Sequence, residues 1–306
     1  MSRAVTRAGD ASVTVAVAQP SELGESPFWH PTEQALYYCD VASLQLNRFD
    51  PNSGALRHWR FDTELASCAP MRDGGLLLAM RDGLWHFDCA SGRRSVLAAA
   101  PYDPQTERFN DGKCDPQGCF WVGTVYEPRD RALASLYRFD GSRLTRKAED
   151  LTVVNGLAWS PSGNALYLSD TRAHAVYEFD FDSASGTLGQ RRAFCQFAVK
   201  PNGASLDGYG GRPDGAAVDV EGNYWVAMFE GRRVLCITPA GVVLRELKLP
   251  VQCPTMPCFG GADLKTLYLT TARHQRSATE LAAQPWAGML LSVRVEVPGL
   301  PVNFFG

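Results

Sequence analysis

Four oxygen-bearing side chains occupy matched positions in a repeated pattern, and together they could hold a metal ion. Glu25, Asn110, Asn155 and Asp214 each lie nine or ten residues before a short apolar and aromatic segment. Two carboxylates and two amide carbonyls form a hard-oxygen donor set that suits Ca²⁺, Mg²⁺ or Mn²⁺. Zinc is less favoured because the set contains neither His nor Cys. The alternative is that these residues form ordinary turns and loops, as Asn155-Gly156 and Asp214-Gly215 often do.

The apolar segments that follow these residues form an internal repeat. Their first residues are 40, 44, 46, 58 and 43 positions apart, and a second strand-like segment follows each one, ending four times in Phe-Asp, at 49–50, 87–88, 139–140 and 179–180. Short strands and Gly-rich turns at this period are typical of a β-propeller with one four-stranded blade per repeat. The sequence therefore predicts an all-β, six-bladed β-propeller. The segments are ALYYCD (35–40), GLLLAM (75–80), CFWVGT (119–124), ALYLSD (165–170), NYWVAM (223–228) and TLYLTT (266–271).

The repeat also predicts the domain organisation. A single blade cannot bury both of its faces, so residues 12–306 are expected to form one propeller domain. Residues 1–11 are expected to be a flexible N-terminal tail, followed by a first strand in VTVAVA (13–18). The Gly- and Pro-rich loop at 200–211 is expected at the rim, near the mouth of the central channel.

The innermost strand of each blade lines the channel, and it precedes the aromatic strand. The matched offset lands on Leu65 or Ala66 in the second repeat, and on Met256 or Pro257 in the sixth. Four of the six channel positions therefore carry oxygen donors. Agreement between separate repeats favours a site over four unrelated turns.

Charge and cysteine content limit the partners. The formal net charge is −3, which provides no basic field for nucleic acid or an anionic membrane, so neither is an expected partner. The apolar run at 13–18 is too short for a signal peptide or membrane span. Nine cysteines without a CxxC pair favour reduced thiols in the cytoplasm. Cys114 with Cys119, and Cys253 with Cys258, have the spacing of a soft-metal site, but buried apolar thiols are the favoured interpretation.

Five stretches resemble the gluconolactonase, regucalcin and luciferin-regenerating-enzyme family of six-bladed propellers. The resemblance implies that one divalent metal is held by Glu25, Asn155 and Asp214. It also implies substrate binding by Arg108 and Asn110, and it suggests Glu127 as a further substrate contact. The stretches are LGESPFW (23–29), RFNDGKCDPQGCFWVGT (108–124), NGLAWSPSGNALYLSDT (155–171), PDGAAVDVEGNYWVA (213–227) and PTMPCFGG (254–261).

The expected activity is hydrolysis of a sugar lactone of the gluconolactone, arabinolactone, xylonolactone or galactonolactone type. A metal would polarise the lactone carbonyl, and Asp214 would act as general base, with hydroxide on the metal as the competing base. Ca²⁺ is the expected cofactor, with Mg²⁺, Mn²⁺, Zn²⁺ and Fe²⁺ as alternatives. One alternative function is a non-catalytic calcium-binding or protein-interaction propeller, and another is a metal-dependent esterase or organophosphatase. The sequence shows no preference for one lactone or one oligomeric state.

Several conspicuous residues are expected outside the chemistry. Asp111 precedes Gly112 and is interpreted as part of a turn, and Lys113 as a solvated or paired surface charge. His174 is expected in a structural or rim role. The tryptophans are expected to pack the blades, with Trp29 or Trp159 bordering the site.

Overall fold

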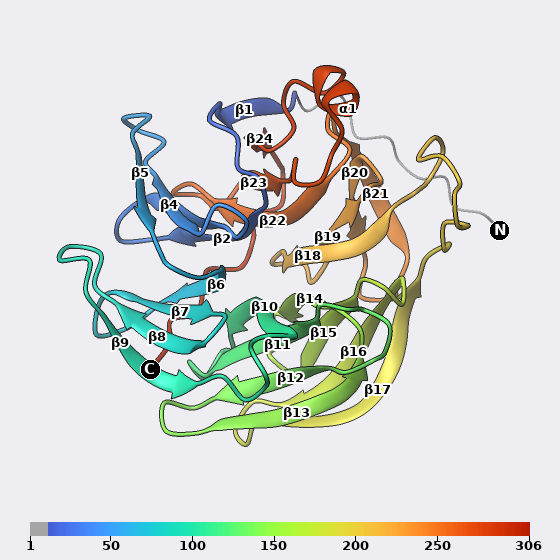
Figure 1. The fold of residues 1–306 in the computed structure, drawn as a ribbon. Coiled ribbons are helices and arrows are strands. Elements are labelled where there is room, and N and C mark those ends of the chain that lie inside the picture. The colour runs from blue at the N-terminus through green and yellow to red at the C-terminus, as the bar shows by residue number, and fades with distance from the viewer. Residues whose placement is uncertain (1–11) are drawn as a thin grey trace.

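Six four-stranded antiparallel sheets surround a central channel in the computed structural model, which describes residues 12–306 (Figure 1). The predicted tail, 1–11, lies outside the described residues. The first sheet contains β2 (Gly24–His30), β3 (Ala35–Asp40), β4 (Gln45–Phe49) and β5 (Leu56–Arg60). The second contains β6 (Leu65–Pro70), β7 (Leu76–Met80), β8 (Gly83–Phe87) and β9 (Arg94–Ala99). The third contains β10 (Glu107–Cys114), β11 (Phe120–Tyr126), β12 (Ala134–Phe139) and β13 (Leu144–Leu151).

The other three sheets complete the ring. The fourth sheet contains β14 (Val154–Trp159), β15 (Ala165–Asp170), β16 (Ala175–Asp182) and β17 (Thr187–Gln196). The fifth contains β18 (Arg212–Val218), β19 (Tyr224–Phe229), β20 (Arg233–Ile237) and β21 (Val243–Lys248). The sixth contains β22 (Pro254–Gly260), β23 (Thr266–Thr271), β24 (Leu290–Arg294) and β1 (Thr14–Val17). The prediction of a six-bladed all-β propeller is confirmed.

Strand β1 closes the ring. It pairs with β24, so the last blade takes its outermost strand from the start of the chain and its other three strands from the end. The sequence predicted this strand but not its partner. Pairing the two ends of the chain removes the open edge that a linear array of blades would leave.

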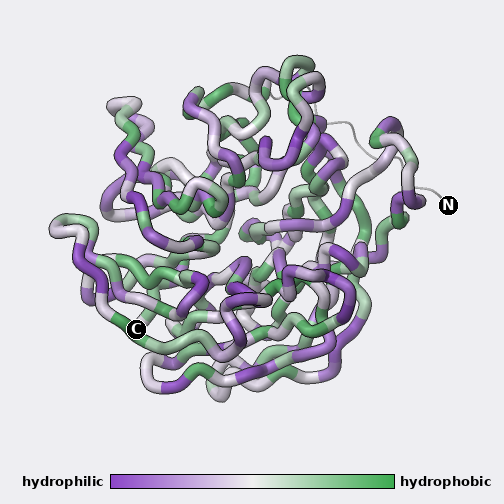
Figure 2. The backbone as a smooth tube through the Cα atoms, viewed as in Figure 1, coloured by the Kyte–Doolittle hydropathy of each residue, from purple (hydrophilic) through white to green (hydrophobic). Residues whose placement is uncertain are grey.

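The predicted aromatic segments form the second strand of each blade. Three of them, β3, β15 and β23, have the predicted bounds, and the other three differ by one or two residues. Strand β3 is buried along its whole length because both of its faces pack against neighbouring blades. Figure 2 shows hydrophobic stretches along such strands, while many turns and outer strands are hydrophilic.

The Phe-Asp endings join the core to a turn. In the first blade Phe49 is buried, and the Asp50 carboxylate accepts hydrogen bonds from the Asn52 amide at 2.9 Å and the Ser53 hydroxyl at 2.8 Å. Such Asp side chains stabilise tight turns. The predicted ending at Asp180 is wrong by two residues, because β16 continues and Asp182 begins the turn.

Every innermost strand carries a β-bulge. The breaks in pairing lie between Glu25 and Phe28, Leu65 and Ser67, Phe109 and Gly112, Asn155 and Ala158, Pro213 and Ala216, and Pro254 and Met256. A bulge turns side chains away from the normal alternation of a strand. The predicted channel positions therefore lie on inner strands, at the points where those strands are irregular.

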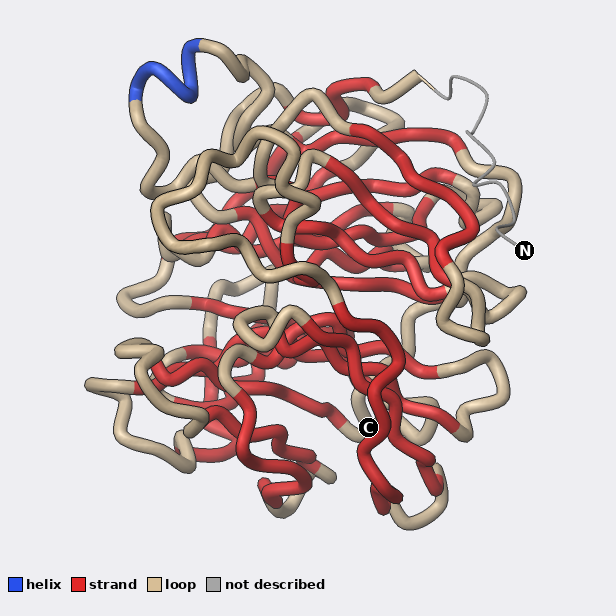
Figure 3. The backbone as a smooth tube through the Cα atoms, turned by 90° about the vertical axis from the view of Figure 1, so that its right-hand side faces the viewer, coloured by secondary structure: helices blue, strands red, loops and turns tan. Residues whose placement is uncertain are grey.

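Between residues 12 and 306, little regular structure lies outside the blades. The helix α1 (Ala278–Ala282) stands apart from the strands in Figure 3. No helix among the described residues is long and apolar enough to cross a membrane. The C-terminal segment 298–306 joins separate blades through bonds from the Leu300 amide to Val218, from Phe305 to Pro70 and from Gly306 to Gly118.

Candidate functional site

Two acidic side chains from separate blades lie near each other at the start of their inner strands. Asp214 on β18 is buried, and burial raises its pKa to about 8. The pKa of Glu25 on β2 is raised well above its usual range, first by burial and then by the charges of Asp214 and Asp111. Neither carboxylate forms a salt bridge within residues 12–306. The two carboxylates repel each other, and the charges of Arg108 on Glu25 and of Arg212 on Asp214 oppose their raised pKa values without forming a salt bridge, so this end of the channel favours a cation.

Asn155 on β14 and Asn110 on β10 occupy matching positions on the inner strands of two further blades. The Asn110 Nδ2 amide donates to Asn155 Oδ1 at 2.7 Å and to the Val154 carbonyl at 2.9 Å. Asn155 in turn donates to Thr171 Oγ1 at 2.8 Å. Asn155 therefore presents its carbonyl oxygen towards β10, with its amide group anchored within its own blade.

Left-handed backbone follows two of the predicted metal ligands. Gly156, after Asn155, has φ +59°, and a Cβ there would lie 2.3 Å from both Ser169 Oγ and Tyr224 Oη. Ser26, after Glu25, has φ +48°. Glycine adopts this conformation without strain, whereas serine does so at a cost. The Gly that suggested an ordinary turn is instead required by a bulge packed against the next blade.

Arg108 and Glu127 lie beside Asn110. Arg108 is buried, and its Nη1 donates to Asn110 Oδ1 at 3.0 Å. Arg108 Nε lies 3.5 Å from Glu127 Oε1. Glu127 also accepts two hydrogen bonds from Arg81, at 2.9 and 3.0 Å. The sequence missed Arg81, since it comes from another blade and no local spacing connects it to Glu127.

Asp111 and Lys113 differ from their predicted roles. Asp111 lies within β10, where it is buried, and its Oδ2 accepts from the Leu157 amide at 2.9 Å, so the Asp-Gly turn is wrong. Its Oδ1 is buried without a hydrogen bond. Burial raises the pKa of Asp111, and Lys113 opposes that shift. Lys113 is not a surface charge either, because its ammonium donates to the Ala216 carbonyl inside the channel at 2.9 Å.

The donor set fits a hard divalent cation. In the described part of the chain no group of three or more His, Cys, Asp and Glu residues is placed to hold a metal. A cation at this end would therefore need the Asn155 carbonyl oxygen in addition to Glu25 and Asp214. Carboxylate and carbonyl oxygens are the ligands that Ca²⁺ prefers. The neighbouring negative charges of Glu25 and Asp214 provide the attraction.

The nine cysteines form no disulfide. Cys114 and Cys258 are buried on inner strands, and burial raises the pKa of both thiols. Cys253 is also buried, while Cys119 is half-buried beside Arg138. Protonated buried thiols pack as small apolar groups.

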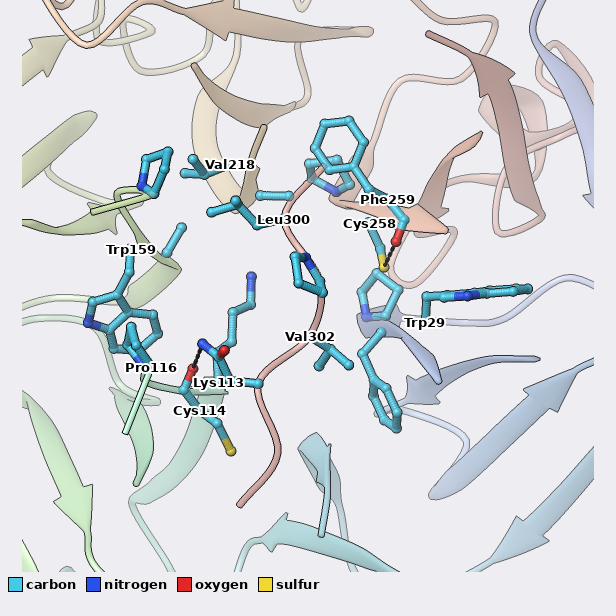
Figure 4. Close-up of a pocket in the computed structure, with 18 of the residues that line it drawn as sticks. Trp29, Lys113, Cys114, Pro116, Trp159, Val218, Cys258, Phe259, Leu300 and Val302 are labelled. Carbon is cyan, nitrogen blue, oxygen red and sulfur yellow. Dashed lines mark hydrogen bonds between the residues drawn. The ribbon is translucent and has the colours of Figure 1, made fainter. Parts of the chain in front are cut away.

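A separate cavity of about 270 Å³ lies at the other end of the channel (Figure 4). It is lined by Trp29, Lys113, Trp159 and Cys258, together with Leu300 and Val302 of the C-terminal segment. Trp29 and Trp159 are at the far ends of β2 and β14, so they border this cavity and not the candidate site. Glu25 and Trp29 are four residues apart on β2, which is about 13 Å along a strand, so they lie at opposite ends of the channel.

The fold and the acidic channel mouth define a six-bladed propeller with a candidate metal centre. Residues 23–273 match the family model described as the SMP-30/Gluconolactonase/LRE-like region. The chain belongs to this family, and it is an enzyme of the class that hydrolyses carboxylic ester bonds.

Named relatives and a solved structure place the chain more closely. It is 43% identical over 290 residues to the 6-deoxy-6-sulfogluconolactonase of Pseudomonas putida, covering 94% of this chain and 97% of the relative. It is 31% identical to regucalcin of Oryctolagus cuniculus, covering 91% and 93%. The crystal structure of a calcium-binding protein, regucalcin, from Agrobacterium tumefaciens has a TM-score of 0.89 at 24% identity, covering 97% and 98%. That last likeness concerns the fold.

Proposed function

We propose that the protein is a metal-dependent lactonase that opens a sugar lactone of the aldonolactone type to the aldonic acid. The observation that carries this proposal is the pair of neighbouring carboxylates, Glu25 and Asp214, which form no salt bridge within residues 12–306, with Asn155 on the inner strand of the adjacent blade. The relationship to lactonases over nearly the whole chain supports the same reaction. The preferred substrate is tested within this class, beginning with the lactone named for the Pseudomonas putida relative.

Three residues would hold the cation, and one of them would also act as the general base. Glu25, Asn155 and Asp214 would hold one divalent cation, with Ca²⁺ as the first candidate. The bound cation would supply Lewis-acid polarisation of the lactone carbonyl. Asp214 would accept a proton from the attacking water, whose oxygen forms a bond to the carbonyl carbon. The ring carbon–oxygen bond then breaks, and the ring oxygen takes a proton to become a hydroxyl.

The neighbouring polar residues would hold the substrate. Arg108 donates from a buried guanidinium, and Asn110 lies between Arg108 and Asn155. Together they would bind ring and exocyclic oxygens, while Glu127 sets the position of Arg108 at the channel mouth. Rigid placement on inner strands keeps these donors in position for the substrate.

A lactone panel with a pH indicator tests the proposal. Protein stripped with chelator is reconstituted with Ca²⁺, Mg²⁺, Mn²⁺, Zn²⁺ or Fe²⁺ and given each lactone, an aryl ester and an organophosphate. We expect lactone hydrolysis that requires a metal and that Asp214→Ala abolishes. Asp73→Ala, on an exposed turn, is the matched control. Hydrolysis that survives both complete metal removal and Asp214→Ala would refute the mechanism.

The cellular compartment is part of the same proposal. Nine thiols without a disulfide are typical of a reducing cytoplasm. Thiol counting on protein isolated under a blocking agent tests this, and disulfides in the native protein would contradict it.

A further inference from the structure

Three arginines stand at the channel mouth on adjacent blades. Arg129 lies in the loop after β11, Arg172 in the turn after β15, and Arg212 at the start of β18. We call these three residues the arginine rim. Each is at the end of its blade where the inner strands begin, because Glu107 pairs with Tyr126, Val154 with Asp170, and Arg212 with Phe229. The rim therefore borders the end of the channel that holds Glu25 and Asp214.

Most other arginines at this end are neutralised by carboxylates. Arg81 and Arg108 share Glu127, while Arg276 contacts Glu230 at 2.9 Å. Arg212 also contacts Glu230, at 3.3 Å.

Arg129 and Arg172 are different. Both are exposed, and neither forms a salt bridge within residues 12–306. The pKa of the Arg129 guanidinium is lowered, first by burial of part of the group and then by the nearby charges of Arg172 and Arg212. The positive charges are thus close enough to repel one another; the charges of Glu127 and Asp214 offset part of that repulsion, and a bound anion would offset more of it.

The surrounding structure holds the rim in place. Arg212 lies over the Phe229 ring, with 5.1 Å between its Cζ and the ring centroid. His174 is buried, and its Nδ1 lies 3.1 Å from the Arg172 carbonyl oxygen while its Nε2 lies 2.7 Å from Tyr209 Oη. His174 therefore ties the Arg172 turn to the loop before β18, which explains its structural role. Preformed positions reduce the ordering cost of binding an anion.

We propose that the arginine rim binds a sulfonate or phosphate group on the substrate, so that the protein prefers an aldonolactone whose exocyclic carbon carries an anionic substituent. This inference rests on the proposed lactonase function. Guanidinium groups match the oxygens of such anions in charge and geometry. In a six-membered aldonolactone of six carbons, C6 is exocyclic and is joined to the ring carbon next to the ring oxygen, so a substituent on C6 projects away from the ring. Binding of the carbonyl near Asp214 would therefore leave the anionic group free to reach the exposed rim.

Steady-state kinetics on matched lactones test the inference. The substrates are gluconolactone and its 6-sulfo and 6-phospho counterparts, given to the wild-type protein and to Arg129→Gln, Arg172→Gln and the double variant. We expect kcat/KM for the anionic lactones, relative to gluconolactone, to fall about tenfold per arginine, mainly through KM. Added salt should lower the same ratio. Arg143→Gln, at an exposed turn at the other end of the channel, should leave the ratio unchanged.

Binding of the sugar acids separates this inference from the lactonase proposal. Calorimetry compares gluconate with 6-phosphogluconate and 6-sulfogluconate on the wild-type protein and the double variant. Tighter binding of one or both charged acids, lost in the double variant, supports the rim even if no lactone is hydrolysed. The two acids distinguish a sulfonate site from a phosphate site. Equal binding of charged and uncharged acids, or an unchanged preference in the double variant, would overturn the inference.

Discussion

The Asn110 side-chain amide donates a hydrogen bond to Asn155 Oδ1 across 2.7 Å, which links the proposed substrate side of the site to the proposed cation side. Asn110 also accepts from Arg108, so three side chains on two blades form one chain of hydrogen bonds. A change at Asn110 should therefore affect both neighbours.

Asn110→Asp should disrupt this chain of hydrogen bonds even though the two side chains have nearly the same size. The carboxylate has the same shape, but it would place an acceptor oxygen against Asn155 Oδ1 and the Val154 carbonyl, both of which now accept from an amide. The loss of a buried hydrogen bond costs about 2 kcal/mol, so we expect kcat/KM to fall about thirtyfold. Asn110→Ser, which retains a donor, should retain more activity. Equal activity of Asn110→Asp and wild type would contradict the proposed arrangement.

Glu127→Gln should loosen Arg108. The substitution removes the charge shared by Arg81 and Arg108 while keeping the side-chain size. We expect KM for the lactone to rise about fivefold with a smaller change in kcat, as a positioning role requires. Glu149→Gln removes a comparable exposed pair with Arg146 on β13 and is the control. A fall in kcat alone would instead place Glu127 in the chemical step.

Gly156→Ala should destabilise both the fold and the site. The new Cβ would meet Ser169 and Tyr224, and it would lie 2.9 Å from the Asp214 carbonyl oxygen, in a left-handed backbone. We expect a loss of about 3 kcal/mol in the free energy of unfolding. Gly203→Ala shares the positive φ but has nothing within 4 Å, so it should cost about 1 kcal/mol. Urea unfolding of the two variants separates backbone strain from the clash.

The Glu64–Arg81 pair should contribute stability that depends on pH. Hydrogen bonds from Arg81 lower the pKa of Glu64 to about 2, below its ordinary value. A lowered pKa means that the stabilisation is fully present above the ordinary value of 4.5 and is lost as the pH falls towards about 2. At neutral pH we expect the free energy of unfolding of the wild type to be about 1 kcal/mol higher than that of Glu64→Gln. The difference is small because the ion pair is partly exposed to solvent. Urea unfolding at about pH 7 and about pH 3 should show this difference shrinking in acid. A constant difference would contradict the pairing.

The repeat in the sequence determined the number of blades and the identity of their second strands. Apolar and aromatic segments such as ALYLSD at 165–170 favour a strand buried on both faces, and their spacing allows one blade each. The same offset located Glu25, Asn155 and Asp214 on inner strands. The local pattern was sufficient to place these residues because every repeat forms the same four-stranded blade, packed in the same way against its neighbours.

Tertiary structure alone decided the partners of those residues. Asp111 and Lys113 looked like a turn and a surface charge because burial depends on the neighbouring blade, which no local pattern records. The pairing of β1 with β24 joins residues at opposite ends of the chain. Arg81 meets Glu127, and Arg129 approaches Arg172 and Arg212, only once the blades close into a ring. Strand periodicity acts over a few residues, whereas these electrostatic contacts depend on distances between blades.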